Sequence, residues 1–250
     1  MNIEKMWKQI LKDIHNKGHI HHKDDAEIKE ILNISGFIDN PGAYAIPATI
    51  KGSISRETFL ECVRTGLYDI DGYNIKGEAL ADYVESLDNR ERIYIDYNDD
   101  SDFVYTYPER LKAIPIAPKF DNFMVEQENQ LEHMIERLKA NKGSNRAVAT
   151  LYNVGLDPYF VEDIPCLNWM QALIRDDELC LVVMFRSNDI YNAFPSNMLF
   201  LMNIGYYITE ELQETYPNLY FGGVYYNCTS AHYYTDVVTD EIIEEIIKWL

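Results

Sequence analysis

The 250-residue sequence contains no apolar run that approaches the roughly 18 residues a membrane-spanning helix needs. Its first stretch, Met1 to Ile14, is charged and amphipathic and lacks the apolar segment of a secretory signal. The four cysteines show no paired CxxC spacing, which argues against a disulfide framework and fits a reducing compartment. Together these absences predict a cytoplasmic protein without membrane segments.

Positive charge is also scarce, with 22 lysines and arginines against 41 aspartates and glutamates and a net charge of −19. No basic stripe or Lys/Arg run appears, which argues against binding to nucleic acid or to an anionic membrane surface. A phosphate ligand is not excluded, because one or two arginines can hold a phosphate even in an acidic protein.

Repeats, linkers and low-complexity tracts are absent as well. The sequence does contain 47% apolar residues, enough for a sizeable core, and 19 tyrosines, which favour strands with buried rings and polar tips. The length suits one domain of ordinary size. We therefore expect a single α+β domain over residues 1–250.

Apolar residues at helical spacing predict six helices. Asp240 is expected to cap the last of them. The predicted helices are Ile3–Ile14, Arg56–Arg64, Gly77–Leu87, Gln127–Ala140, Met198–Leu212 and Asp240–Leu250.

Strands are predicted where apolar residues run between turn signals, and two such runs on either side of residues 175–178 predict a hairpin. The segment Asp102–Leu111 is expected to be extended. His15–Asp25 contains a cluster of His19, His21 and His22 but no further ligand to complete a metal site, so it is expected to be a polar loop. The predicted strands are Ile31–Ile38, Arg146–Tyr152, Leu167–Ile174, Leu179–Phe185 and Leu219–Cys228.

Residues able to do chemistry gather in the second half of the chain. Cys166 follows Pro165 directly before a predicted buried strand, which would place its thiol at the strand's entrance. Arg186 ends the second strand of the same hairpin, where an unpaired buried charge would cost several kcal/mol. Position alone leaves two alternatives open: a structural cysteine with a structural ion pair, or a reactive thiol beside a phosphate-binding arginine.

Polar residues are crowded between that hairpin and the following helix, and they are costly to bury unless a ligand or a structural role uses them. They include Ser187, Asn188, Asp189 and Asn197. His232 follows a third predicted strand, where a lone histidine is usually structural.

In chain order, these residues resemble the active-site series of thymidylate synthases: Pro165-Cys166, Arg186-Ser187-x-Asp189, Asn197 and His232-x-Tyr234. The spacing of 20 residues from Cys166 to Arg186, and of 11 from Arg186 to Asn197, is that of the family. Three upstream segments are similar to family segments too, the first to its archaeal form, so the resemblance covers residues 100–235. These segments are Asp102–Leu111, Leu138–Val148 and Asn153–Gly155.

The resemblance implies an α+β fold in which a mixed β-sheet packs against helices and two subunits meet sheet to sheet. It also implies transfer of a one-carbon unit from 5,10-methylenetetrahydrofolate to C5 of dUMP, giving dTMP, through a covalent adduct with a cysteine. No metal is implied. The partners would be dUMP, the folate and a second copy of the chain.

The resemblance further implies a role for each site residue. Cys166 would be the nucleophile, and Arg186 would bind the 5′-phosphate and polarise the thiol. Asn197 would read N3–H and O4 of uracil, a match for its amide. The remaining roles would be phosphate binding by Ser187 and, across the dimer interface, Arg146; 3′-hydroxyl binding by His232 and Tyr234; pterin contact by Asp189; and support of the proton network by Tyr107.

A glutamate is expected as general acid and base in the first half of the chain. Glu61 is the first candidate and Glu57 the second, since both lie on the predicted helix Arg56–Arg64. The alternative for each is a solvated helix face.

The sequence departs from the family pattern at several positions, among them Leu167, Phe185 and Asn145. The C-terminal tail that closes over folate is expected to be absent or replaced by Asp240–Leu250. Three hypotheses stay open: a thymidylate synthase, a dUMP or dCMP 5-hydroxymethylase of the same fold, and a non-catalytic nucleotide-binding relative. Asn197 favours dUMP, because cytosine-specific members carry Asp there, and the pairing of Cys166 with Arg186 favours an enzyme.

Overall fold

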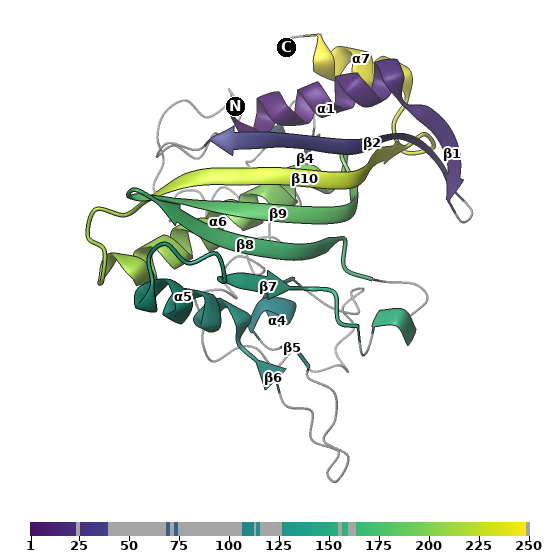
Figure 1. Ribbon diagram of the computed structural model, residues 1–250. Coiled ribbons are helices and arrows are strands. Elements are labelled where there is room, and N and C mark those ends of the chain that lie inside the picture. Colours follow the sequence, from purple (N-terminus) through teal and green to yellow (C-terminus); the bar gives the residue numbers. More distant parts are fainter. Residues whose placement is uncertain are drawn as a thin grey trace.

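A mixed β-sheet packed with helices forms the centre of the protein, as a computed structural model shows (Figure 1). The structure describes residues 1–23, 26–39, 69–70, 73–74, 107–112, 114–115, 127–154, 157–159 and 164–248. The predicted helices Arg56–Arg64 and Gly77–Leu87 lie outside the described residues, and so do Glu61 and Glu57. Within the described part, the α+β class expected from the sequence is confirmed.

The main sheet has six strands in the order β1-β2-β10-β9-β8-β7. Neighbours are antiparallel except β9 and β10, which are parallel and are connected through a helix. The predicted hairpin is confirmed as β8 and β9. The strand bounds are β1 His19–Lys23, β2 Ala26–Asp39, β7 Val148–Thr150, β8 Leu167–Arg175, β9 Glu178–Asp189 and β10 Tyr220–Tyr234.

Two short antiparallel pairs lie outside the main sheet. They are β3 (Asp69–Ile70) with β4 (Tyr73–Asn74), and β5 (Ile114–Pro115) with β6 (Gln127–Glu128).

The long helix α6, Phe194–Gln213, packs against β9 and β10 on one face of the sheet. Its side chains include Phe200, Leu201 and Ile204, all fully buried, which explains why the helix is apolar nearly all round. None of the described helices is both long and apolar enough to span a membrane. The other helices are α1 Ile3–Lys17, α4 Tyr107–Lys112, α5 Gln130–Ala140, α7 Asp240–Ile247 and the 3₁₀ turn η1 Asp157–Tyr159.

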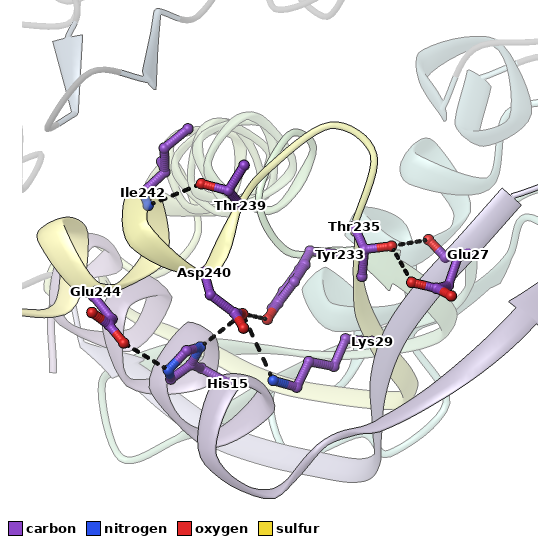
Figure 2. A network of polar contacts seen from close by, with 9 residues as sticks. All are labelled: His15, Glu27, Lys29, Tyr233, Thr235, Thr239, Asp240, Ile242 and Glu244. Carbon is purple, nitrogen blue, oxygen red and sulfur yellow. Dashed lines mark hydrogen bonds and ion pairs between the residues drawn. The ribbon is translucent and has the colours of Figure 1, made fainter.

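The two terminal helices, α1 and α7, lie side by side beyond β2 (Figure 1). Figure 2 shows Asp240 between His15 of α1, Lys29 of β2 and Tyr233 of β10. The prediction that Asp240 caps α7 is wrong: Thr239 is the cap, and its hydroxyl accepts from the backbone of Ile242. Asp240 instead ties the helix to three other elements.

Two segments expected to lack regular structure, or to be extended, differ from the prediction. His19–Lys23 is a strand rather than a loop, because its backbone pairs with β2, and a polar edge strand of this kind discourages pairing with other chains. Tyr107–Lys112 is a helix rather than an extended segment. Pro108 sits in its first turn, where a missing N–H costs nothing.

The strands that carry the candidate site are longer than predicted. β9 continues to Asp189 and β10 to Tyr234, because β10 finds partners on both sides, in β2 and in β9. Arg186, expected at the end of its strand, and His232, expected after its strand, therefore both lie within strands. α6 begins at Phe194, which places Asn197 in its first turn.

Candidate functional site

Cys166 lies immediately before β8, at the strand entrance that the sequence predicts. Its carbonyl accepts the backbone N–H of Arg186 at 2.8 Å, which fixes the residue against β9. Its sulfur lies 3.6 Å from Oγ of Ser187, and the residue is partly exposed, whereas Cys228 is buried. The geometry thus presents one accessible thiol beside a hydroxyl.

Arg186, expected at the end of a buried strand, does not form the structural ion pair that was one of the two alternatives left open by the sequence. Its side chain is exposed, and its guanidinium donates from Nε to the carbonyl of Pro165 at 3.1 Å and from Nη2 to that of Ile164 at 2.5 Å. No carboxylate of the described residues pairs with it. The guanidinium therefore braces the segment before Cys166 while its positive charge stays available to an anion.

Ser187 connects these two groups. Its Oγ accepts from Nη1 of Arg186 at 3.2 Å and lies beside the Cys166 sulfur, and the residue itself is buried. A thiol, a hydroxyl and a guanidinium thus converge from two adjacent strands.

Asn197 lies in the first turn of α6 and contacts Asn188, the residue after Ser187. Its Nδ2 donates to Oδ1 of Asn188 at 3.2 Å, and Nδ2 of Asn188 donates in turn to the hydroxyl of Tyr226 at 3.2 Å. Sequence reasoning noted Asn188 only as one of several crowded polar residues. It missed Tyr226 altogether, because a tyrosine within a strand gives no signal that distinguishes it from core.

His232 and Tyr234 are neighbours on the same side of β10, with ring centroids 5.4 Å apart. His232 is 3% exposed, and its Nδ1 finds no hydrogen-bond partner among the described residues. Burial lowers the pKa of His232, and the opposing effect of Asp189 does not reverse this. A neutral ring with an unpaired nitrogen can accept from, or donate to, a ligand hydroxyl.

Asp189 and Tyr107 both hold backbone near the site. The carboxylate of Asp189 accepts from the backbone of Tyr191 and Asn192 at 3.1 and 3.0 Å, which closes the turn that leads into α6. The Tyr107 hydroxyl accepts the N–H of Leu167, next to Cys166, at 3.3 Å.

Arg146 is the predicted site residue that this chain does not bring to Cys166. It precedes β7, and the pairing of Val148 with Gln171 places it near the far end of β8, roughly 20 Å along the strand from Cys166. Its side chain is exposed and has no partner among the described residues.

The other face of the sheet is hollowed. The buried residues Leu181, Val183 and Phe185 of β9 face α6, so their alternates face the opposite side. There a hollow of about 730 Å³ is lined by apolar and aromatic side chains together with Arg175, Glu178 and Asn227, and Tyr225 is 47% exposed. The lining includes Phe37, Leu173, Val182 and Tyr225.

Comparison with known proteins relates residues 80–248 to the thymidylate synthase family. A protein of Methanocaldococcus jannaschii is 32% identical over 203 residues, which are 78% of this chain and 82% of the relative. One from Methanothermobacter thermautotrophicus is 27% identical over 248 residues, covering 97% and 94%. Both carry the name "Putative thymidylate synthase". The "Deoxyuridylate hydroxymethyltransferase" of Bacillus phage SP01 is 26% identical over 255 residues, covering 97% of this chain and 60% of the phage protein.

Proposed function

Because the chain belongs to the thymidylate synthase family, we propose that it is an enzyme that transfers a one-carbon unit from 5,10-methylenetetrahydrofolate to C5 of dUMP and produces dTMP. The observation that carries this proposal is the cluster of Cys166, Ser187 and Arg186. In it a partly exposed thiol lies 3.6 Å from a hydroxyl, beside a guanidinium that no described carboxylate neutralises.

The proposed reaction uses Cys166 as a nucleophile because C5 of uracil is a poor one. Addition of the thiolate to C6 forms a C–S bond and moves the ring electrons toward O4, so that C5 can attack the one-carbon electrophile. Loss of the C5 proton then breaks the bond from the transferred carbon to the folate nitrogen and leaves an exocyclic methylene on the ring. Hydride from the tetrahydrofolate adds to this methylene to give methyl as the C–S bond breaks, which restores the C5–C6 double bond and releases dihydrofolate and the thiolate.

The proposed substrate contacts come from β9, from the first turn of α6 and from β10. Arg186 and Ser187 bind the 5′-phosphate, Asn197 reads the base, and His232 with Tyr234 holds the 3′-hydroxyl. The buried, unpartnered Nδ1 of His232 supports the last of these assignments. Asp189 contacts the pterin, Tyr107 supports the proton network, and Glu61, outside the described residues, serves as general acid and base.

The proposed assembly is a homodimer that pairs the hollowed faces of two sheets, with Arg146 reaching the phosphate site of the partner subunit. Two observations support it. The hollowed face carries exposed aromatic and apolar side chains, and Arg146 lies too far from Cys166 of its own chain to share a phosphate with it.

A 5-hydroxymethylase is the second candidate, because the phage relative is named for transfer of a hydroxymethyl group to deoxyuridylate. In that reaction water, rather than hydride, adds to the exocyclic methylene. The folate, whose bond to the transferred carbon broke when the methylene formed, gives up no hydride and is released as tetrahydrofolate. The two products differ by one oxygen atom and are separated by mass.

The test is mass spectrometry of dUMP incubated with methylenetetrahydrofolate and the protein, beside Cys166→Ser and Cys180→Ser. We expect a methyl gain with dihydrofolate, abolished only in Cys166→Ser, since Cys180 lies on the opposite face of the sheet. A hydroxymethyl gain would select the second candidate. No product from dUMP or dCMP, with no difference from Cys166→Ser, would overturn both.

A further inference from the structure

The amide of Asn197 is the outer end of a chain of hydrogen bonds that runs into the core. It donates to Asn188, which donates to the Tyr226 hydroxyl. Tyr226 is hydrogen-bonded to Cys228, and the thiol of Cys228 donates to the backbone carbonyl of Ser230 at 3.3 Å. The chain therefore crosses from α6 through β9 to β10.

The backbone carbonyl of Ser230, the last acceptor, sets the direction of every hydrogen bond in this series. A backbone carbonyl can only accept, so the single hydrogen of Cys228 is used there and its sulfur is left to accept from Tyr226. The Tyr226 oxygen is then the acceptor for Nδ2 of Asn188. This leaves Oδ1 of Asn188 facing Asn197, where only an N–H can meet it.

Burial keeps this direction from reversing. Asn188 is 1% exposed, Tyr226 is fully buried and Cys228 is 2% exposed, so water cannot supply replacement partners. Burial also raises the pKa of Cys228 to about 11 and that of Tyr226 well above its ordinary value. Both groups keep their hydrogens across the neutral range and stay donors.

We propose that Asn188, Tyr226 and Cys228 are positioning residues that hold the Asn197 amide with its oxygen free and one N–H free, and so select a uracil edge over a cytosine edge. This inference rests on the proposed function, in that the ligand is a pyrimidine deoxynucleotide. Uracil offers an N3–H donor and an O4 acceptor, which match this presentation. Cytosine offers an N3 acceptor and an N4–H donor instead. Turning the Asn197 amide to meet this edge would place Oδ1 of Asn197 against Oδ1 of Asn188.

The test compares dissociation constants of dUMP and dCMP by calorimetry, without folate, so that turnover plays no part. In Cys228→Ala the Tyr226 hydroxyl loses its acceptor and is free to donate to Asn188, which lets the whole chain reverse. We expect the preference for dUMP over dCMP to fall about tenfold, the weight of roughly one hydrogen bond. Cys228→Ser keeps a donor and an acceptor and should retain the preference.

Tyr226→Phe serves as a second variant if Cys228→Ala does not fold, and it should show the same fall because Asn188 loses its acceptor. An unchanged preference in either folded variant would overturn the inference, and so would an equal loss in Cys228→Ser and Cys228→Ala. Binding of dUMP by the unsubstituted protein distinguishes failure of the proposed function from failure of the inference. If dUMP does not bind, the proposed function fails and the inference fails with it. If dUMP binds and the variants keep their preference, only the inference fails.

Discussion

Single side chains at this site each contact more than one functional group. Ser187 is buried, yet its hydroxyl meets both the Cys166 sulfur and the Arg186 guanidinium. Arg186 in turn braces the two carbonyls that precede Cys166. The position of the thiol and the position of the positive charge are thus coupled through one hydroxyl.

Substitution Ser187→Ala should lower kcat/KM for dUMP by about 10- to 100-fold, because a hydrogen bond to a charged group contributes about 1.5–3 kcal/mol. The measurement is steady-state kinetics with dUMP, with binding of deoxyuridine, which lacks the phosphate, as the ligand control. We expect little change for deoxyuridine. An equal loss with both ligands would mean that Ser187 only supports the fold.

His232 should make stability depend on pH in one direction. Its pKa is lowered from 6.5 in the folded protein, so below about pH 6.5 the unfolded chain binds a proton first and the free energy of unfolding falls. Above about pH 6.5 the buried, neutral His232 no longer makes the free energy of unfolding depend on pH. Denaturant titrations between pH 5.5 and 8 should show a shallower fall in His232→Gln, and parallel curves would contradict this origin.

At the scale of elements, ion pairs connect neighbouring helices and strands. Some of these ion pairs are buried and others are exposed to solvent. Arg110 of α4 contacts Asp157 of η1 at 2.6 Å, with side chains 8% and 0% exposed. Asp157 also accepts the backbone N–H of Asn153. The Asp240 network that joins α7 to α1 is mostly solvated, as its 61% exposed side chain shows (Figure 2).

Asp157→Ala should therefore lower the free energy of unfolding by about 3–5 kcal/mol, because it removes the buried carboxylate that pairs with the Arg110 guanidinium. Asp240→Asn, which removes a charge from the exposed network, should cost about 1 kcal/mol or less. Urea titration measures both. The double variant Arg110→Met with Asp157→Leu should regain most of the lost free energy of unfolding. If it does not, the cost of Asp157→Ala comes from lost packing and not from the broken ion pair.

At the scale of the whole molecule, the proposed homodimer would complete the site with a residue of the second chain. Arg146 lies far along β8 from Cys166 of its own subunit, while the hollowed face of the sheet offers a surface to a second copy. In a two-fold dimer each chain would place its Arg146 at the phosphate site of the other chain.

Mixing Arg146→Ala with Cys166→Ser should consequently restore activity that neither variant has alone. Random exchange makes half of the dimers hybrid, and one of the two sites in each hybrid is intact, so about one quarter of the wild-type rate is expected. A mixture of Cys166→Ser with the double variant is the control and should stay inactive. No recovery in hybrids confirmed by native mass spectrometry would contradict the donation of Arg146.

Local patterns in the sequence sufficed for the elements whose residues meet near neighbours. The β8–β9 hairpin follows from two apolar runs around a polar turn, and α5 and α6 follow from helical spacing. The order and spacing of Cys166, Arg186 and Asn197 also sufficed to indicate the family, because a site made from consecutive elements leaves its spacing in the chain.

Contacts between distant segments were beyond such reasoning. The full length of β10 depends on backbone pairing with β2, about 200 residues away along the chain. The exposure of Arg186 and the chain from Asn197 through Tyr226 to Cys228 depend on which faces the strands turn toward α6. By itself the sequence indicated the family and the residues that we propose to carry the chemistry. Only the tertiary structure decided their orientation, since a hydrogen-bond direction depends on partners that no local pattern contains.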